Sequence, residues 1–124
     1  MKKTHALILL FLGLTLSAYS QNIQLIQELR RKAANSEGIE KYKTLNDLAW
    51  EYRSAYPDST IIYAKQAYSL GKRLNVTKDL AESPNFIGVA YNYKGDRIKA
   101  YESYDEAMEI STQYNDSAQI AYSN

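Results

Sequence analysis

Residues 88–110 read GVAYNYKGDRIKAYESYDEAMEI, and small residues and tyrosines recur in this stretch at helical spacing. The small residues are Gly88, Ala100 and Ala107, and the tyrosines beside them are Tyr91 and Tyr104. Two helices approach to about 8–10 Å only where small side chains lie at their crossing. The pattern therefore predicts a packed pair of helices whose tyrosines fill core space, with a tyrosine-lined ligand cage as the alternative.

The middle of the stretch, Lys94-Gly95-Asp96, predicts the turn between these two helices. Glycine allows the backbone conformations that a tight turn needs, and the Asp96 carboxylate is expected to cap the second helix. Apolar residues also follow a helical period on both sides of an earlier turn, Tyr56-Pro57-Asp58-Ser59, and strand-like alternation is absent. The sequence thus predicts an all-α protein.

The helix pair that begins at Pro84 has a counterpart earlier in the chain. Leu45, Leu48, Ala49 and Tyr52 align with Pro84, Ile87, Gly88 and Tyr91 at an offset of 39 residues. Thr60, Ala64, Ala67 and Leu70 align with Ala100, Tyr104, Ala107 and Ile110 at an offset of 40, with the extra residue in the turn. Self-similarity at such a period is typical of helical repeat proteins.

These residues resemble the tetratricopeptide repeat family, whose signature is W-x2-L-G-x2-Y, then A-x3-F, then P. The unit that begins at Pro84 is the more similar, through Ile87-Gly88-x-x-Tyr91 and Ala100-x3-Tyr104. Leu45 and Pro84 stand where the family prefers tryptophan, the terminal proline is missing, and the repeat is longer than the family's length of about 34 residues. The resemblance implies antiparallel helix hairpins stacked as a right-handed α-solenoid of about two and a half repeats.

The expected organisation has five parts. These are an export signal at 1–20, an N-terminal helix at 21–35, one repeat at 36–75, a second at 76–115, and the start of a third at 116–124. The third unit opens with Ala121-Tyr122-Ser123-Asn124, where the sequence stops, so we expect the solenoid to be truncated.

The first twenty residues have the pattern of a cleaved export signal. Two lysines precede an apolar run at 6–16, and Ala18 and Ser20 place small side chains before a cut between Ser20 and Gln21. A membrane anchor is the alternative, but eleven helical residues span only about 16 Å of a core about 30 Å thick. We therefore expect a periplasmic or cell-envelope protein without a membrane span in its mature part.

The mature chain offers few groups for catalysis. The only histidine of the sequence, His5, lies in the export signal, and cysteine is absent, which excludes thiol chemistry and histidine-based zinc sites in the mature chain. Glu102, Asp105, Glu106 and Glu109 follow one another at helical spacing and predict a solvated acidic face rather than a catalytic or calcium site. A formal net charge of +1 does not favour nucleic acid. We expect no enzyme activity, no cofactor, no metal and no nucleic-acid partner.

A candidate partner-binding stripe lies beside the apolar stripe of the first repeat. Its residues are Asn46, Trp50 and Arg53, with counterparts Asn85, Val89 and Asn92 in the second repeat and Tyr93 adjacent. In the resembled family this stripe lines a concave groove. Amides suit an extended peptide backbone, a guanidinium suits a carboxylate, and an indole suits an apolar anchor. The alternative is that Trp50 packs against the N-terminal helix around Ile26 and Leu29.

Two hypotheses of function follow. The first is an exported helical-repeat scaffold that binds a protein or peptide in its groove and performs no catalysis. The second is the extracytoplasmic input domain of a bacterial transmembrane signalling protein, either a histidine kinase or a transcriptional regulator, whose exported repeat arrays the sequence resembles. A helical glycan-processing enzyme is a third class, and it needs a buried carboxylate that the sequence does not indicate. The oligomeric state stays open.

Two local expectations concern helix boundaries. Pro84 disfavours helix at Ser83, yet Leu80 and Ala81 share the stripe of Ile87. We therefore expect a bent helix that begins near Lys78, in preference to one that begins at Ser83. Asn35-Ser36 interrupts the helical pattern, and Ser36 is expected to cap the helix that follows.

Overall fold

The computed structural model describes residues 2–123, and among these all side chains except those of 17–19, 21 and 116–123. This part of the chain is helical and contains no strand, as the sequence predicted. The elements are α1 (Lys2–Asn35), α2 (Gly38–Tyr52), α3 (Pro57–Arg73), the 3₁₀ helix η1 (Lys78–Ala81), α4 (Glu82–Tyr93) and α5 (Arg97–Ser123).

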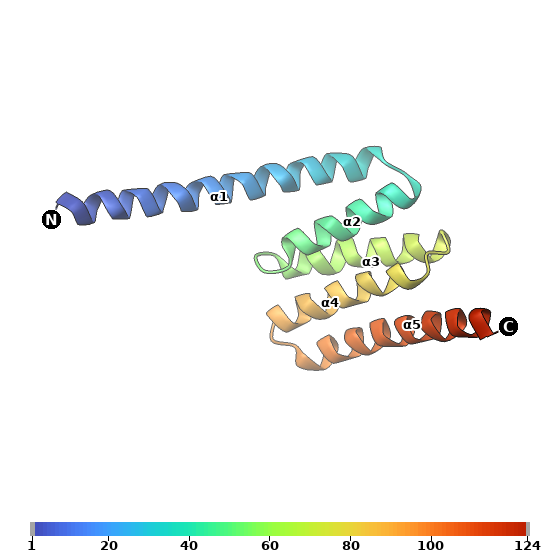
Figure 1. The fold of residues 1–124 in the computed structure, drawn as a ribbon. Coiled ribbons are helices and arrows are strands. Elements are labelled where there is room, and N and C mark those ends of the chain that lie inside the picture. Colours follow the sequence, from blue (N-terminus) through green and yellow to red (C-terminus); the bar gives the residue numbers. More distant parts are fainter. Residues whose placement is uncertain (1, 124) are drawn as a thin grey trace.

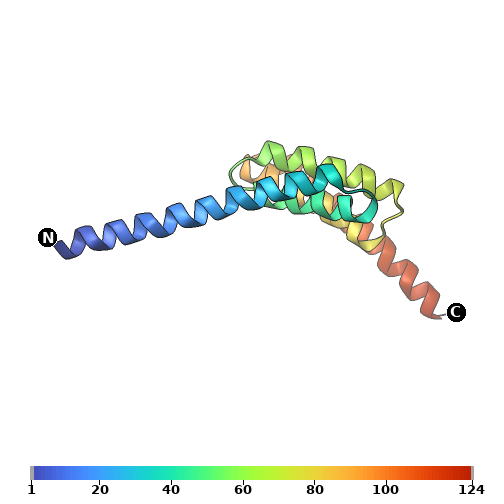
Figure 2. The same cartoon turned by 90° about the horizontal axis from the view of Figure 1, so that it is seen from above.

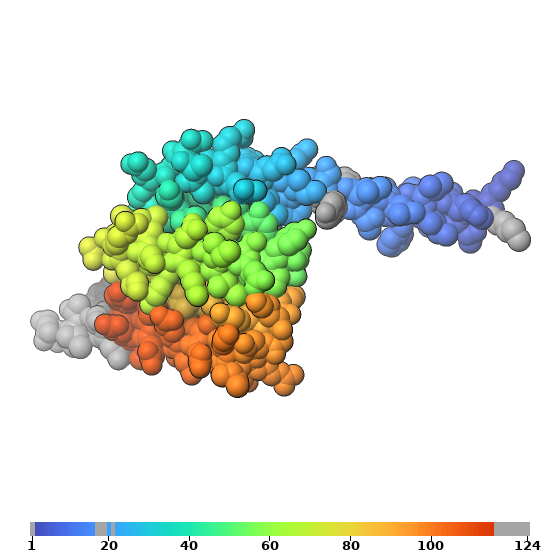
Figure 3. Space-filling model, turned by 180° about the vertical axis from the view of Figure 1, so that it is seen from behind, coloured from blue at the N-terminus to red at the C-terminus, as the bar shows by residue number. Residues whose placement is uncertain are grey.

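Helices that follow one another in the sequence pack side by side and run in alternating directions (Figure 1). α2 lies against both α1 and α3, and it also contacts α4. The first part of α1 extends beyond the packed body in both ribbon views (Figures 1 and 2). The space-filling view shows the same projection beside a continuous body (Figure 3).

The projecting part of α1 carries exposed apolar side chains. They are Leu7, Ile8, Leu9, Leu10, Phe11, Leu12, Leu14 and Leu16. The helix joins the body only later, through Ile26, Leu29 and Ala33. The predicted cut after Ser20 lies within this continuous helix, and Ala18 and Gln21 on either side of it fall outside the described side chains. Among the helices of residues 2–123, none combines the length and the apolar character that a membrane crossing requires.

The larger core cluster lies where α1, α2 and α3 meet. Its buried members are Ala33, Tyr42, Leu45, Leu48 and Ala67. The Tyr42 hydroxyl donates a hydrogen bond of 2.6 Å to the backbone carbonyl of Asp79. This bond links the core to η1 and satisfies a polar group that would otherwise be costly to bury.

A second cluster joins α2, α3 and α4 through Ala49, Ala64 and Ile87. The buried Thr60 hydroxyl donates to the carbonyl of Ala49 over 2.7 Å, so α2 and α3 approach closely at this point. Tyr91 packs against the same cluster. Its position agrees with the expectation that the tyrosines fill core space.

The contact between α4 and α5 depends on Gly88, as the sequence predicted. A Cβ atom at Gly88 would lie 2.5 Å from Cε1 of the Tyr104 ring, which is shorter than carbon atoms tolerate. A similar contact, which the sequence did not suggest, occurs at Gly71, where a Cβ would lie 2.8 Å from atoms of Tyr42 and Leu80. Two close helix contacts therefore require the absence of a side chain.

The turns expected at Pro57 and Gly95 are present. Pro57 is the first residue of α3, where its missing amide hydrogen has no helical partner to lose. Gly95 has φ +79°, a conformation that side-chain-bearing residues rarely adopt. The Asp96 carboxylate accepts a hydrogen bond of 3.2 Å from the backbone amide of Lys99, which confirms the predicted cap of α5.

The expectation of one long helix from Lys78 through Pro84 is wrong. A 3₁₀ turn occupies 78–81, and α4 begins at Glu82, so Pro84 lies in the first helical turn. An α-helix from Lys78 would need a hydrogen bond from residue 84 to the carbonyl of Leu80, and proline has no amide hydrogen to donate. The 3₁₀ turn keeps Leu80 and Ala81 buried without requiring that bond.

The expected capping role of Ser36 is also wrong. Its hydroxyl is buried without a hydrogen-bond partner, and Glu37, at the N-cap position of α2, makes no side-chain capping bond. The connection instead turns at Gly38, whose φ is +60°. The side chains of the expected third repeat, 116–124, lie outside the described residues.

Candidate functional site

The seven residues of the predicted binding stripe are not equivalent in the structure. Trp50 and Arg53 lie together at the end of α2, and Asn46 is buried inside the body. On α4, Asn85, Asn92 and Tyr93 are exposed and Val89 is half-buried. The face that they share is therefore narrower than the sequence indicated.

Asn46 is a core residue, with only 1% of its surface exposed. The hydroxyl of Ser83 donates a hydrogen bond of 2.9 Å to its side-chain oxygen, while its side-chain nitrogen has no partner. The expectation of an accessible amide at this position is wrong. Because α2 is packed against α1, α3 and α4, its buried arc is wide enough to include Asn46.

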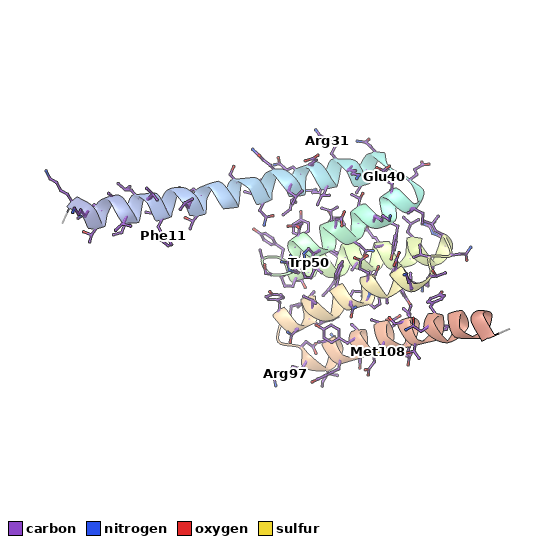
Figure 4. All side chains as sticks on the ribbon, viewed as in Figure 1. Phe11, Arg31, Glu40, Trp50, Arg97 and Met108 are labelled. Atoms are coloured by element: carbon purple, nitrogen blue, oxygen red, sulfur yellow. The ribbon has the colours of Figure 1, made fainter. Side chains whose placement is uncertain are left out.

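Trp50 is held at the surface by two neighbours. Its ring centroid lies 5.2 Å from that of Phe86 on α4, and the guanidinium carbon of Arg53 lies 3.7 Å from the indole centroid. Arg53 also donates a hydrogen bond of 2.6 Å to the Trp50 carbonyl, which fixes the guanidinium over the ring. The indole remains 41% exposed near the C-terminal end of α2 (Figure 4). A preorganised indole of this kind is a good contact point for a partner.

The alternative contact of Trp50 with the N-terminal helix is not the arrangement observed. Its aromatic partner is Phe86 of α4, and Ile26 and Leu29 pack instead against the cluster that contains Leu45 and Leu48. Trp50 therefore stabilises the contact between α2 and α4 rather than the attachment of α1.

The two exposed amides of α4 lie in different hollows. Asn85 lines a hollow between α2 and the η1–α4 segment, whereas Asn92 lines one with Arg97, Tyr101 and Tyr104 of α5. A single extended peptide segment within one hollow does not meet both amides. Of the two amides, only that of Asn85 shares a hollow with residues of α2.

The hollow beside Asn85 has a volume of about 600 Å³ and is mostly charged. Its lining residues are Lys43, Asp47, Lys78, Asp79, Ala81, Glu82 and Asn85. Sequence reasoning identified only Asn85 among them. Lys43, Asp47 and Trp50 follow one another at i, i+4 and i+7, so the polar period of α2 was a signal for this face.

The carboxyl group of Glu82 lies among like charges in this hollow. Loss of solvent around its carboxyl group raises its pKa above the usual 4.5, and the neighbouring charges of Asp47 and Asp79 raise it further. Each effect disfavours the ionised form. The hollow therefore holds three carboxylates, of which Asp47 and Asp79 repel the charge of Glu82, and its lining also includes Lys43 and Lys78.

We expect Glu82→Gln to stabilise the protein at neutral pH by a few tenths of a kcal/mol, a small value because solvent screens charges at this depth. The folded-state pKa of Glu82 lies above 4.5, so the wild type loses stability as the pH rises through that pKa, and the variant does not. The advantage should disappear below about pH 4.5, where both forms are neutral. Urea unfolding at the two pH values measures this.

The control for this prediction is Glu102→Gln, which removes a charge from an exposed position of α5. This variant should change the free energy of unfolding little, and the change should be the same at both pH values. Equal behaviour of the two variants would show that the carboxylates of the hollow do not interact.

The side chains described here contain no group of three or more histidine, cysteine, aspartate or glutamate residues placed to hold a metal ion. The surface where α2 meets α4, called here the α2–α4 face, carries aromatic and charged side chains. They are Trp50, Arg53 and Phe86, together with the charged residues of the hollow beside Asn85. Comparison with protein-family models, curated proteins and solved structures finds no match to this chain.

Proposed function

We propose that the chain is an exported helical-repeat scaffold of the tetratricopeptide type that binds a protein or peptide partner. The aligned helix pairs supply the first support, because α2–α3 and α4–α5 are successive antiparallel pairs whose close contacts involve the aligned small residues Ala49 and Gly88. The proposed activity is binding rather than catalysis. A right-handed stack of such pairs is part of the same proposal.

One observation carries the proposed binding role. The exposed indole of Trp50 is held by Arg53 and Phe86 on the face where α2 meets α4, beside the charged hollow of Asp47 and Glu82. A fixed aromatic side chain loses little conformational freedom on binding, and it contributes a large contact area. The neighbouring charges add selectivity for partners of complementary charge.

The proposed export rests on the first helix. The apolar side chains of 7–16 are exposed, whereas the contacts of α1 with the core begin at Ile26. Cleavage after Ser20 would therefore leave those core contacts in place. N-terminal sequencing of the protein recovered from the cell envelope tests this proposal, and an intact Met1 terminus would contradict it.

The binding proposal predicts selective loss of a partner. Capture from a cell-envelope extract should yield a partner that binds the wild type and is lost with Trp50→Ala and with Asp47→Lys. Asp47 is exposed, so this second variant changes the charge of the face without removing a core contact. We expect each change to weaken binding by about tenfold or more, as central interface residues do.

The matched control is Ile62→Ala, which removes an exposed apolar side chain from α3, a helix that contributes no residue to the lining of the charged hollow. It should retain the partner, and circular dichroism should show that all variants are folded. Retention of the partner by folded Trp50→Ala and Asp47→Lys would overturn the proposed face.

A further inference from the structure

A second hollow lies on the other side of α2, where α1, α2 and α3 meet. Its two adjoining parts have volumes of about 380 and 280 Å³ and share Lys41, Leu45 and Gln66 in their linings. Four cationic side chains surround the combined hollow, namely Arg30, Lys41, Lys65 and Arg73. No aspartate or glutamate lines either part.

These cations lack intramolecular counter-ions. The ion pairs formed by the described side chains use Lys32, Lys94 and Lys99, and none uses a cation of this hollow. The local sequence explains the imbalance, because 59–78 contains no acidic residue. Lys41 is half-buried, so its charge is less well hydrated than that of a fully exposed lysine. The hollow is thus a concentration of positive charge that no carboxylate among the described side chains neutralises by an ion pair.

The lining also contains neutral hydrogen-bonding groups. Gln66 and Ser69 lie among the cations on α3, where an amide and a hydroxyl can bind oxygen atoms. Guanidinium groups bind two oxygens of a carboxylate or phosphate at once, and ammonium groups add point charges. Four positive charges favour an anionic group over a neutral one, and the tetrahedral phosphate presents its oxygen atoms in several directions, so that more than one cation can contact it.

We propose that this hollow binds a phosphate-type oxyanion, either a free phosphate ester or the phosphate of a lipid headgroup. The site is separate from the α2–α4 face, so it does not depend on the proposed partner binding. Each of its two parts lies near the lower end of the range for small-ligand sites, about 300–1,000 Å³, which suits a single phosphate-bearing group in one part.

The first experiment uses inorganic phosphate and the full chain. Thermal unfolding is followed in sodium phosphate and in sodium chloride of equal ionic strength, so that screening is the same in both. We expect the melting temperature to rise with phosphate concentration and to saturate, because a ligand that binds the folded state stabilises it by mass action. Equal melting temperatures in the two salts would overturn the proposal.

Two double variants test whether the stabilisation by phosphate comes from binding in this hollow. Lys65→Gln with Arg73→Gln removes two exposed cations from α3 and should raise the phosphate dissociation constant about tenfold, as the loss of two charge-assisted contacts implies. Lys43→Gln with Lys78→Gln removes the same charge from the opposite hollow and should leave the constant unchanged. An equal loss in both pairs would mean general attraction to a cationic surface, which contradicts a defined site.

The second experiment distinguishes the two sources of phosphate. Vesicles of phosphatidylglycerol are compared with vesicles of phosphatidylcholine, so that any contribution of the apolar part of α1 is common to both. Tighter binding to phosphatidylglycerol that is lost with Lys65→Gln and Arg73→Gln identifies a lipid headgroup. A response to inorganic phosphate without this preference identifies a soluble phosphate ester.

Discussion

Replacement of Leu48 by alanine is expected to lower the free energy of unfolding by about 3–5 kcal/mol. Leu48 is fully buried in the cluster where α1, α2 and α3 meet, so its removal leaves a cavity between helices that cannot all move inward. Small domains have a total stability of about 5–15 kcal/mol, so this single change should leave a substantial unfolded population. Urea unfolding followed by circular dichroism measures the loss.

The control for Leu48 is Ile62→Ala on α3, where the side chain is 56% exposed. This change should cost less than about 1 kcal/mol, because little apolar surface returns to water. Equal losses at the two positions would show that Leu48 is not buried between α1, α2 and α3 in solution.

Replacement of Gly88 by valine is expected to cost about 3 kcal/mol, the upper part of the range for overpacked sites. The added Cβ would lie within 2.5–3.0 Å of three atoms of the Tyr104 ring, so α4 and α5 must separate or the ring must move. The two added methyl groups increase the crowding further. Urea unfolding again gives the loss.

The double variant Gly88→Val with Tyr104→Ala tests the cause. If the ring is what valine meets, the cost of Gly88→Val should fall by more than half once the ring is gone, which is the non-additivity expected of residues in contact. Additive losses would place the strain elsewhere in the helix.

The helices and their main turns could be predicted because their signals are local. Helical period, Pro57 at the start of α3 and Gly95 with Asp96 before α5 each act within a few residues. The contact of Gly88 with Tyr104 was also predictable, because a small residue in an apolar stripe indicates where a neighbour approaches. These features form in the same way whichever other helices pack around them.

Burial around α2 could not be predicted from its own sequence. The burial of Asn46 depends on α4, which brings Ser83 against its amide from 37 residues away. The counterpart Asn85 remains exposed, although the sequence alignment pairs the two positions. The sequence pattern predicts the same exposure for Asn46 and Asn85. Their exposures differ because α2 and α4 pack against different helices.

The start of α4 was mispredicted for a different reason. The apolar pattern of Leu80 and Ala81 indicates that they are buried, and this is correct, but burial does not specify the type of helix. The 3₁₀ turn of η1 and an α-helix place these side chains similarly, and only the missing amide hydrogen of Pro84 distinguishes between them. The charged hollow follows the polar period of Lys43 and Asp47 on α2, a signal that the stripe of Asn46 and Trp50 does not contain.

Trp50 is an intrinsic fluorescence probe of the contact between α2 and α4. It is the only tryptophan in the chain, and it lies where α2 meets α4, with a guanidinium over one face and Phe86 beside it. Its fluorescence therefore reports on the contact between α2 and α4, and separation of these two helices exposes more of the indole to water. Because the chain contains no cysteine, one introduced thiol can carry an acceptor dye at any chosen helix. Distances from a single native donor to each helix of the stack are then measurable in solution without removing any other residue.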